Sequence, residues 1–311
     1  MRPVPDTDGS FGGSGRRIGF AILGAVGHLP FWFLYGVADI LFALAYYIVR
    51  YRRRLVARNL AESFPEKTPQ ELRRIEKQFY RNLADYAVET LKLAHISDAE
   101  MRRRMTFDGV GIIDESLARG RSVTVYFSHC FNWEWAPSVT LWSRYADNSR
   151  VAFCQIYRPL RSRFSDAWFL TLRSRFGSRS LAKARSFRDL LALRRDGRLW
   201  VTGFMSDQKP SHNDPVVEVD FMGRQTPVIT GTETVARKLD TTVVYWDMSK
   251  TQRGHYHITT RLITDSPRDL PQHEITRRYF AMLSETLRRQ PANWLWSHNR
   301  WHHFVNLPSK E

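Results

Sequence analysis

Short stretches with strand character alternate with helical stretches along most of this chain, and this alternation limits the possible folds more than any other feature. The expected strands are rich in β-branched and aromatic residues; they are Thr106–Asp108, Ser122–Phe127, Val151–Tyr157, Leu199–Met205, Val216–Phe221, Thr241–Asp247 and Tyr256–Ile263. Apolar residues at helical spacing predict helices over Gly111–Arg119, Leu160–Phe176, Ala184–Arg195, Gly231–Lys238 and Glu274–Arg289. The pattern therefore predicts an α/β fold with a mostly parallel central sheet flanked by helices.

One strand leads directly into a group of reactive side chains. After Phe127 the chain reads Ser-His-Cys-Phe-Asn-Trp-Glu-Trp, and from Trp133 onward the apolar residues recur at helical spacing. His129 thus follows a strand and precedes a helix, which is a favoured place for chemistry in an open α/β sheet.

The spacing of His129 and Glu134 restricts how the two residues can interact. Residues five apart in one helix differ by about 500°, so two mid-helix residues at this spacing do not face each other. They can pair if His129 lies in the loop and Glu134 reaches back from the first helical turn. The carboxylate then fixes the imidazole tautomer and leaves the other nitrogen free as a base. The helix N-terminus adds N–H groups that suit an oxyanion, so we expect a general-base site for acyl transfer.

The same spacing recurs at His95 and Glu100. There a simpler explanation exists, because Ser97 and Glu100 have the positions of a capping box that opens a helix. Only the His129 motif has a strand before it and a helix after it. We therefore expect His129 to be the base and His95 to be an ordinary helix-end residue.

Three polar residues follow expected strands, namely His129, Arg158 and Asp207. Ligands in open α/β sheets bind beyond the carboxyl ends of the strands, so these residues are expected to converge at one site. Backbone N–H groups near Asn132, with Arg158, are expected to hold the oxyanion.

The stretch FSHCFNWEW resembles the H-F-G-N-W-E signature of the late acyltransferases of lipid A biosynthesis, the lauroyl/myristoyl family within the wider glycerolipid acyltransferase group. It departs from that signature at Cys130 and Phe131. Tyr157-Arg158-Pro159, Asp207-Gln208 and the later blocks FMGRQTPVITGTETVARK and WLWSHNRW also resemble this family, so the resemblance covers roughly Phe20–Val305.

The resemblance implies the substrates and some of the site residues. The implied donor is an acyl carrier protein thioester, and the implied acceptor is a hydroxyl of an anionic lipid A precursor. Arg158 is carried over as a site residue, and Asp207 with Gln208 as a structural or binding pair. No cofactor is implied.

The charge of the chain agrees with anionic partners. The 311 residues carry a net charge of +16 and the pI is about 10.2, which favours an acidic protein, a phosphorylated lipid, an anionic membrane or nucleic acid. No nucleic-acid-binding motif is present, so nucleic acid is not an expected partner. Cys130 and Cys154 have no metal-like spacing and form no disulfide framework.

An apolar run near the N-terminus predicts attachment to a membrane. Leu29–Val49 has 21 residues with Asp39 as its single charge, which is long enough to cross a bilayer. Arginines follow it at positions 50, 52, 53, 54 and 58, so the positive-inside rule places the following domain in the cytoplasm. We expect a disordered N-terminus over residues 1–17, a membrane-anchoring helix over 18–50 and an acyltransferase domain over 51–311. The expected location is the cytoplasmic face of a bacterial inner membrane.

Several alternatives remain open from the sequence. The apolar run is also compatible with a helix that lies in the membrane interface, or with a buried core helix. Cys130 as a nucleophile and a metal site at His298 and His302 are weaker hypotheses, and no metal is expected. The enzyme alternative is a phospholipid, ornithine-lipid or glycolipid acyltransferase with the same machinery, and the non-enzyme alternatives are an inactive membrane-bound scaffold or a basic protein that binds membranes or nucleic acid.

Overall fold

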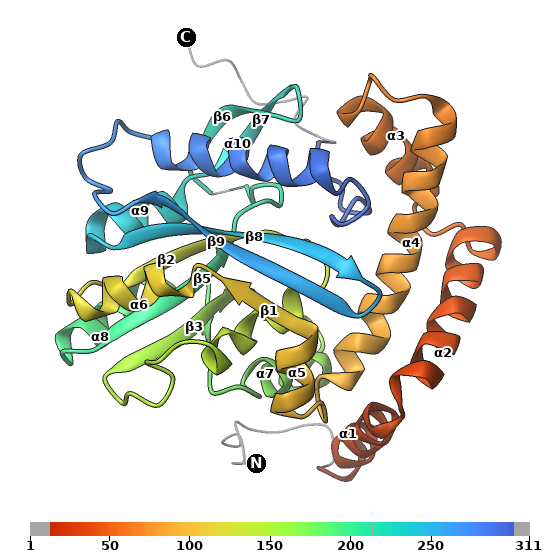
Figure 1. Ribbon diagram of the computed structural model, residues 1–311, viewed down its shortest axis with the longest axis horizontal. Coiled ribbons are helices and arrows are strands. Elements are labelled where there is room, and N and C mark those ends of the chain that lie inside the picture. The colour runs from red at the N-terminus through yellow and green to blue at the C-terminus, as the bar shows by residue number, and fades with distance from the viewer. Residues whose placement is uncertain (1–12, 213, 302–311) are drawn as a thin grey trace.

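The computed structural model describes residues 13–212 and 214–301, and in these residues the predicted central sheet is present with seven strands (Figure 1). The strands are β1 (Met105–Asp108), β2 (Val123–Phe127), β3 (Val151–Tyr157), β4 (Arg179–Ala182), β5 (Leu199–Met205), β8 (Thr242–Gln252) and β9 (His255–Thr264). Their order is β1-β9-β8-β2-β5-β3-β4, and the pairs are parallel except for β8 with β9. The predicted α/β fold with a mostly parallel sheet is confirmed.

Helices cover both faces of the sheet. On one face lie α8 (Ser186–Arg195), α9 (Gly231–Leu239) and α10 (Glu274–Arg289). There Tyr126 of β2 stacks on Tyr279 of α10 with ring centroids 4.5 Å apart, and Trp200 of β5 packs with Leu190 of α8. The other face is covered by α6 (Val110–Ala118) and a 3₁₀ helix, η2 (Trp133–Leu141).

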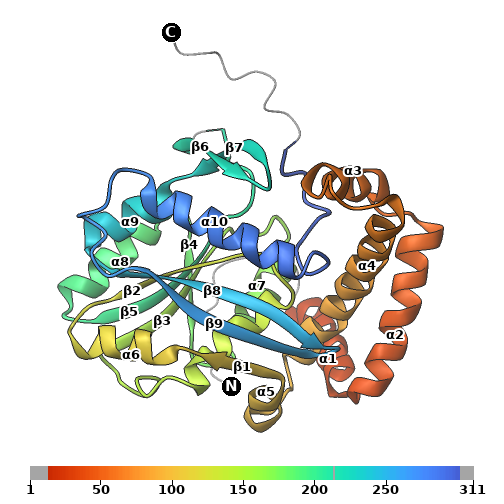
Figure 2. The ribbon, with the colours of Figure 1, turned by 45° about the horizontal axis from the view of Figure 1, so that its top comes forward.

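The N-terminal helices form a separate group at one end of the sheet, on the right in Figures 1 and 2. They are α1 (Gly13–His28), α2 (Phe31–Ala43), the short π-helix η1 (Leu44–Ile48), α3 (Arg53–Ser63) and α4 (Pro69–Lys92). Thr68 and Glu71 form the capping box that opens α4. The short α5 (Asp98–Arg104) connects this group to β1, and Ser97 accepts a hydrogen bond from the Glu100 N–H at its start.

The apolar run lies on the surface with one side buried. Among the described residues, Phe31–Ile48 is the segment long and apolar enough to cross a membrane. Every fourth residue of this segment packs on the core, namely Leu34, Ala38, Phe42 and Tyr46. The outward side exposes large apolar side chains, namely Trp32, Phe33, Ile40, Leu41, Leu44, Tyr47 and Ile48. The helix is therefore packed on α4 on one side and apolar on the other.

Some local predictions were wrong. The helix expected from Trp133 is a 3₁₀ helix with Pro137 inside it, because proline cannot donate the hydrogen bond that an α-helix requires. Val216–Phe221 is β6, which pairs outside the central sheet with β7 (Arg224–Ile229) in a hairpin that the sequence did not predict. β4 was also missed. The helix expected over Leu160–Phe176 is the shorter α7 (Arg163–Arg173).

The expected disordered N-terminus lies mostly outside the described residues. Residues 1–12 are not described, and residues 13–17 belong to α1. The predicted division into a membrane-anchoring helix and a following domain stays a prediction.

Candidate functional site

Three neighbouring strands end at the same edge of the sheet and place the predicted site residues together. β5 lies between β2 and β3. His129 follows β2, Arg158 follows β3 and Asp207 follows β5, as the positions of the strand ends predict. A pocket of about 430 Å³ opens here, and its lining includes His129, Arg158 and Gln208. The convergence expected from the sequence is therefore present in the fold.

The imidazole of His129 is held by Asp207. His129 Nδ1 lies 2.8 Å from Asp207 Oδ1, and the His129 backbone N–H donates to Asp207 Oδ2 at 2.9 Å. Because a carboxylate can only accept, Nδ1 carries the proton and Nε2 is left as the basic nitrogen. The geometry thus provides a histidine whose free nitrogen faces a pocket.

Asp207 is fully buried and receives a third hydrogen bond. The Trp294 indole N–H donates to Asp207 Oδ2 at 2.7 Å. Burial alone would raise the pKa of Asp207, but the facing His129 and the hydrogen bonds from His129 and Trp294 outweigh it and hold this pKa at about 2. The carboxylate is therefore charged at neutral pH and supports a positive charge on His129.

The basic nitrogen of His129 contacts Gln208. Gln208 Nε2 lies 3.0 Å from His129 Nε2, so its amide donates to the lone pair that would take a proton. Next to it, His298 Nε2 accepts from the Lys209 N–H at 3.2 Å, and burial lowers the pKa of His298 to about 4. His298 is thus neutral at physiological pH.

Glu134 has a different partner from the one that the spacing predicts. Its carboxylate forms a bidentate ion pair with Arg173 of α7, at 2.6 and 2.8 Å, and accepts from the Trp133 indole N–H at 3.2 Å. The predicted hydrogen bond to His129 is replaced by that of Asp207. Glu134 stands in the first turn of η2 as expected, but the Arg173 guanidinium and the Trp133 indole hold its carboxylate, so it does not reach back to His129. Glu134 and Arg173 still line the same pocket as His129.

Of the residues between His129 and Glu134, Cys130, Phe131 and Asn132 are fully buried, whereas Trp133 lines the pocket. Asn132 is buried: its Oδ1 accepts from the Glu134 N–H at 3.2 Å and its amide donates to Glu89 at 3.1 Å. The Glu134 N–H is thus already bonded and is not offered to an oxyanion. Phe131, which stands where the resembled signature has Gly, is fully buried and stacks on Trp133 rather than lining the pocket.

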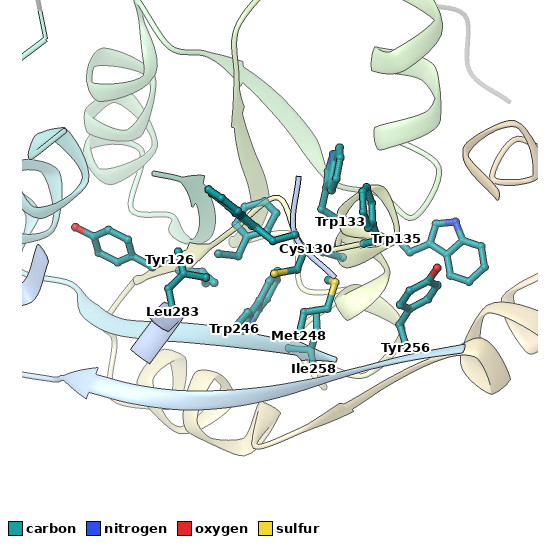
Figure 3. Packing of buried hydrophobic residues seen from close by; sticks show 14 of the residues in the cluster. Tyr126, Cys130, Trp133, Trp135, Trp246, Met248, Tyr256, Ile258 and Leu283 are labelled. Atoms are coloured by element: carbon teal, nitrogen blue, oxygen red, sulfur yellow. The ribbon is translucent and has the colours of Figure 1, made fainter. Parts of the chain in front are cut away.

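The Cys130 thiol is unsuited to act as a nucleophile. It lies in the packed interior that Figure 3 shows with Trp246 and Met248. Burial raises the pKa of the thiol to about 12. Because the thiolate is the reactive form, Cys130 is unreactive near neutral pH.

Two residues of this site were missed in the sequence. Trp294 belongs to a C-terminal segment that pairs with the loop after β2, since the Phe131 N–H donates to the Asn293 carbonyl and the Leu295 N–H to the His129 carbonyl. The tryptophan-rich ending was the available signal for it. Arg173 is one of many arginines, and nothing local distinguishes it.

The described residues contain no group of three or more His, Cys, Asp or Glu side chains arranged to hold a metal ion. His302, the second member of the hypothetical pair with His298, lies outside the described residues.

Comparisons with known proteins identify a family. A family model described as bacterial lipid A biosynthesis acyltransferase matches residues 14–303, which is nearly the whole chain. No curated protein matches the chain.

Proposed function

Because the chain belongs to the bacterial lipid A biosynthesis acyltransferase family, and is therefore an acyltransferase that acts on lipid A precursors, we propose that it transfers a fatty acyl chain from an acyl carrier protein thioester to a hydroxyl of such a precursor. The observation that carries this proposal is the His129–Asp207 pair, with the basic nitrogen of His129 facing the pocket. Such a pair activates a hydroxyl for attack on an acyl group.

His129 is the proposed general base. The acceptor hydroxyl takes the place of the Gln208 amide at His129 Nε2 and gives its proton to this nitrogen. The oxygen attacks the thioester carbonyl, and a tetrahedral oxyanion forms. When this intermediate collapses, the carbon–sulfur bond breaks and the proton passes from His129 to the leaving thiolate. Asp207 holds the imidazole and stabilises its transient positive charge.

Cationic residues are proposed to stabilise the oxyanion. Arg158, Arg173, Lys183 and Lys209 line the pocket. Arg173 is held in place by Glu134, and Lys183 by Asp214 at 2.8 Å, so both are positioned charges. Arg158 stands at an exposed position directly after β3. Because Arg158 lines the pocket at the same edge of the sheet as His129, it is the proposed oxyanion donor. Glu134 is proposed to act by positioning Arg173.

The proposed partners rest on the net charge of the chain, the cationic rim of the pocket and the exposed apolar side of the N-terminal helix. An acidic carrier protein and a phosphorylated lipid both suit a chain with a net charge of +16 and a pocket with a cationic rim. The apolar outward side of Phe31–Ile48 is the proposed membrane contact. Since Asp39 of this helix pairs with Arg253 of the α/β domain at 2.7 Å, the helix is proposed to lie in the interface of the inner membrane, on its cytoplasmic face, packed on its own domain.

The experiment is an acyl-transfer assay with matched histidine variants. With a carrier thioester and a lipid A precursor, followed by mass spectrometry, His129→Ala is expected to lower the rate by about 10²–10⁴, the usual range for losing a general base. The control is His95→Ala, which has the same spacing to a glutamate but stacks on His28 outside the pocket. It is expected to retain the wild-type rate.

A wild-type rate in His129→Ala would refute this assignment of the base. Supplying lysophospholipids and other hydroxylated lipids in the same assay tests the acceptor. Faster transfer to one of these than to the lipid A precursor would refute the proposed acceptor.

A further inference from the structure

Two cavities lie on one side of the sheet and share a wall. The pocket at His129 has three lining residues in common with a smaller apolar cavity of about 20 Å³, namely Phe127, Pro137 and Gln155. The smaller cavity lies between the sheet and η2, and its other lining residues include Phe153, Gly203 and Trp246. The pocket at His129 and the inner cavity are thus separated by these three shared residues.

The ring of Phe127 lies over a strand position that has no side chain. In the sheet, Val125 of β2 and Gln155 of β3 both pair with Gly203 of β5, so Gly203 lies between two side chains on the face that η2 covers. A Cβ at Gly203 would lie 2.9 Å from Phe127 Cε1. Glycine within a central strand often marks a close approach, and here it leaves the room that the Phe127 ring occupies.

The Phe127 ring is supported on its inner side. It packs edge-on against Trp246, with ring centroids 5.9 Å apart, and only 7% of the residue is exposed. Phe127 lines both the pocket at His129 and the inner cavity, so its ring forms part of the wall between them. The rim of the pocket instead carries Arg158, Lys183 and Lys209, which suit charged groups rather than the end of a hydrocarbon chain.

We propose that Phe127, seated on Gly203, sets the maximum length of the acyl chain that the enzyme transfers. This inference rests on the proposed acyl transfer. The thioester carbonyl lies at His129, the hydrocarbon runs inward between β2, β3 and η2, and its end meets the Phe127 ring. A chain too long for this space has to displace a packed aromatic ring.

The test is the chain-length profile of acyl transfer with carrier thioesters that differ by two carbons. Phe127→Leu removes part of the ring and opens the pocket toward the inner cavity. The longest efficiently used chain is expected to lengthen by at least two carbons, with a gain of about 10-fold or more in kcat/KM for that chain, since one methylene in an apolar pocket is worth roughly this factor. Gly203→Ala pushes the ring toward the pocket and is expected to shorten the preferred chain.

The matched control is Phe153→Leu. Phe153 is buried and lines the inner cavity but not the pocket at His129. The same substitution therefore enlarges the inner cavity without opening the pocket into it. Its melting temperature is expected to fall about as much as that of Phe127→Leu, while its chain-length profile stays that of the wild type. An unchanged profile in folded Phe127→Leu, or an equal shift in Phe153→Leu, would overturn the proposal.

A binding measurement separates this proposal from the proposed function. Free fatty acids of graded length are added to wild type and Phe127→Leu, and the rise in melting temperature is recorded for each length. The length that gives the largest rise is expected to increase in the variant, whether or not transfer to a lipid A precursor is observed. Absence of transfer in the wild type would refute only the proposed function, whereas an unchanged optimum in this series would refute the role of Phe127.

Discussion

At the scale of single residues, the site depends on which carboxylate faces His129. Asp207 accepts from both the side chain and the backbone of His129 and from Trp294, and it is fully buried. Glu134 is only five positions from His129 in the sequence, but its carboxylate is bonded to Arg173. The two acidic residues thus have separate tasks: the first is that of Asp207, which holds the base His129, and the second is that of Glu134, which holds the Arg173 cation of the pocket.

Replacing Asp207 by asparagine tests the first task. Asp207→Asn keeps the shape but removes the charge that supports a protonated His129 and permits the wrong imidazole tautomer. We expect kcat to fall by about 10³–10⁴, as in other acyl-transfer sites with such a pair. The rate is measured by acyl transfer, with circular dichroism as the control for folding. A loss smaller than that of Glu134→Gln would contradict the assignment.

The acid stability of the protein should also depend on Asp207. Its pKa in the folded protein is about 2, below the ordinary value of 3.8. Because this pKa is lower in the folded state, the ionised Asp207 stabilises the folded protein at pH values above its pKa in the unfolded chain. This stabilisation is lost as the pH falls from about 4 to about 2. We expect the difference in free energy of unfolding between wild type and Asp207→Asn to shrink by about 2 kcal/mol over this range. Urea denaturation at several pH values measures it, and a constant difference would disprove the expectation.

The second task is tested by a double-mutant cycle on Glu134 and Arg173. Glu134→Gln leaves a largely buried guanidinium without its carboxylate, so we expect a loss of about 2–3 kcal/mol in stability together with a lower rate. Adding Arg173→Gln removes the unpaired charge and should restore part of the stability but not the rate. If the two substitutions are additive in stability, Glu134 does not act through Arg173.

At the scale of elements, the apolar helix has two different sides. The inner side, with Leu34 and Phe42, packs on the core, and Tyr35 donates to Glu89 of α4 at 3.1 Å. The outer side leaves Ile40 61% exposed and Ile48 71% exposed. Glu89 is also bonded to Asn132 beside the site. The helix is therefore an integral part of the structure as well as the proposed membrane contact.

The two sides predict two different phenotypes. Ile40→Gln combined with Ile48→Gln should weaken binding to vesicles at least about 10-fold, because each buried isoleucine is worth about 1.5–3 kcal/mol, while the melting temperature stays unchanged. Phe42→Ala should instead lower the stability by about 3 kcal/mol. Vesicle flotation and thermal unfolding measure the two effects. Undiminished flotation of the double variant would show that other surfaces bind the membrane.

At the scale of the whole molecule, the excess of basic residues predicts a salt-sensitive encounter with an acidic carrier protein. The range of electrostatic attraction falls from about 10 Å at 0.1 M salt to about 3 Å at 1 M. We expect kcat/KM for a carrier-bound thioester to fall about 10-fold or more between low and high salt. A thioester of a small uncharged thiol is the control and should show little change. Equal salt dependence of the two donors would argue against electrostatic attraction of the carrier.

The backbone pattern of this chain was largely readable from its sequence, because periodicity and capping act over a few residues. The alternation of strands and helices predicted the sheet, Ser97 and Glu100 predicted the start of α5, and the strand ends predicted that His129, Arg158 and Asp207 meet. The resemblance at His129 agreed with the family that the comparisons identify.

The pairing of side chains within the site was decided by the tertiary structure. His129 bonds to a residue 78 positions away and Glu134 to one 39 positions away, whereas their mutual spacing of five predicted a pair. Such contacts depend on the order of strands in the sheet and on where α7 places Arg173, neither of which a local pattern specifies. The same holds for Phe127 over Gly203, because only the register of β2 against β5 brings an aromatic ring above a residue without a side chain.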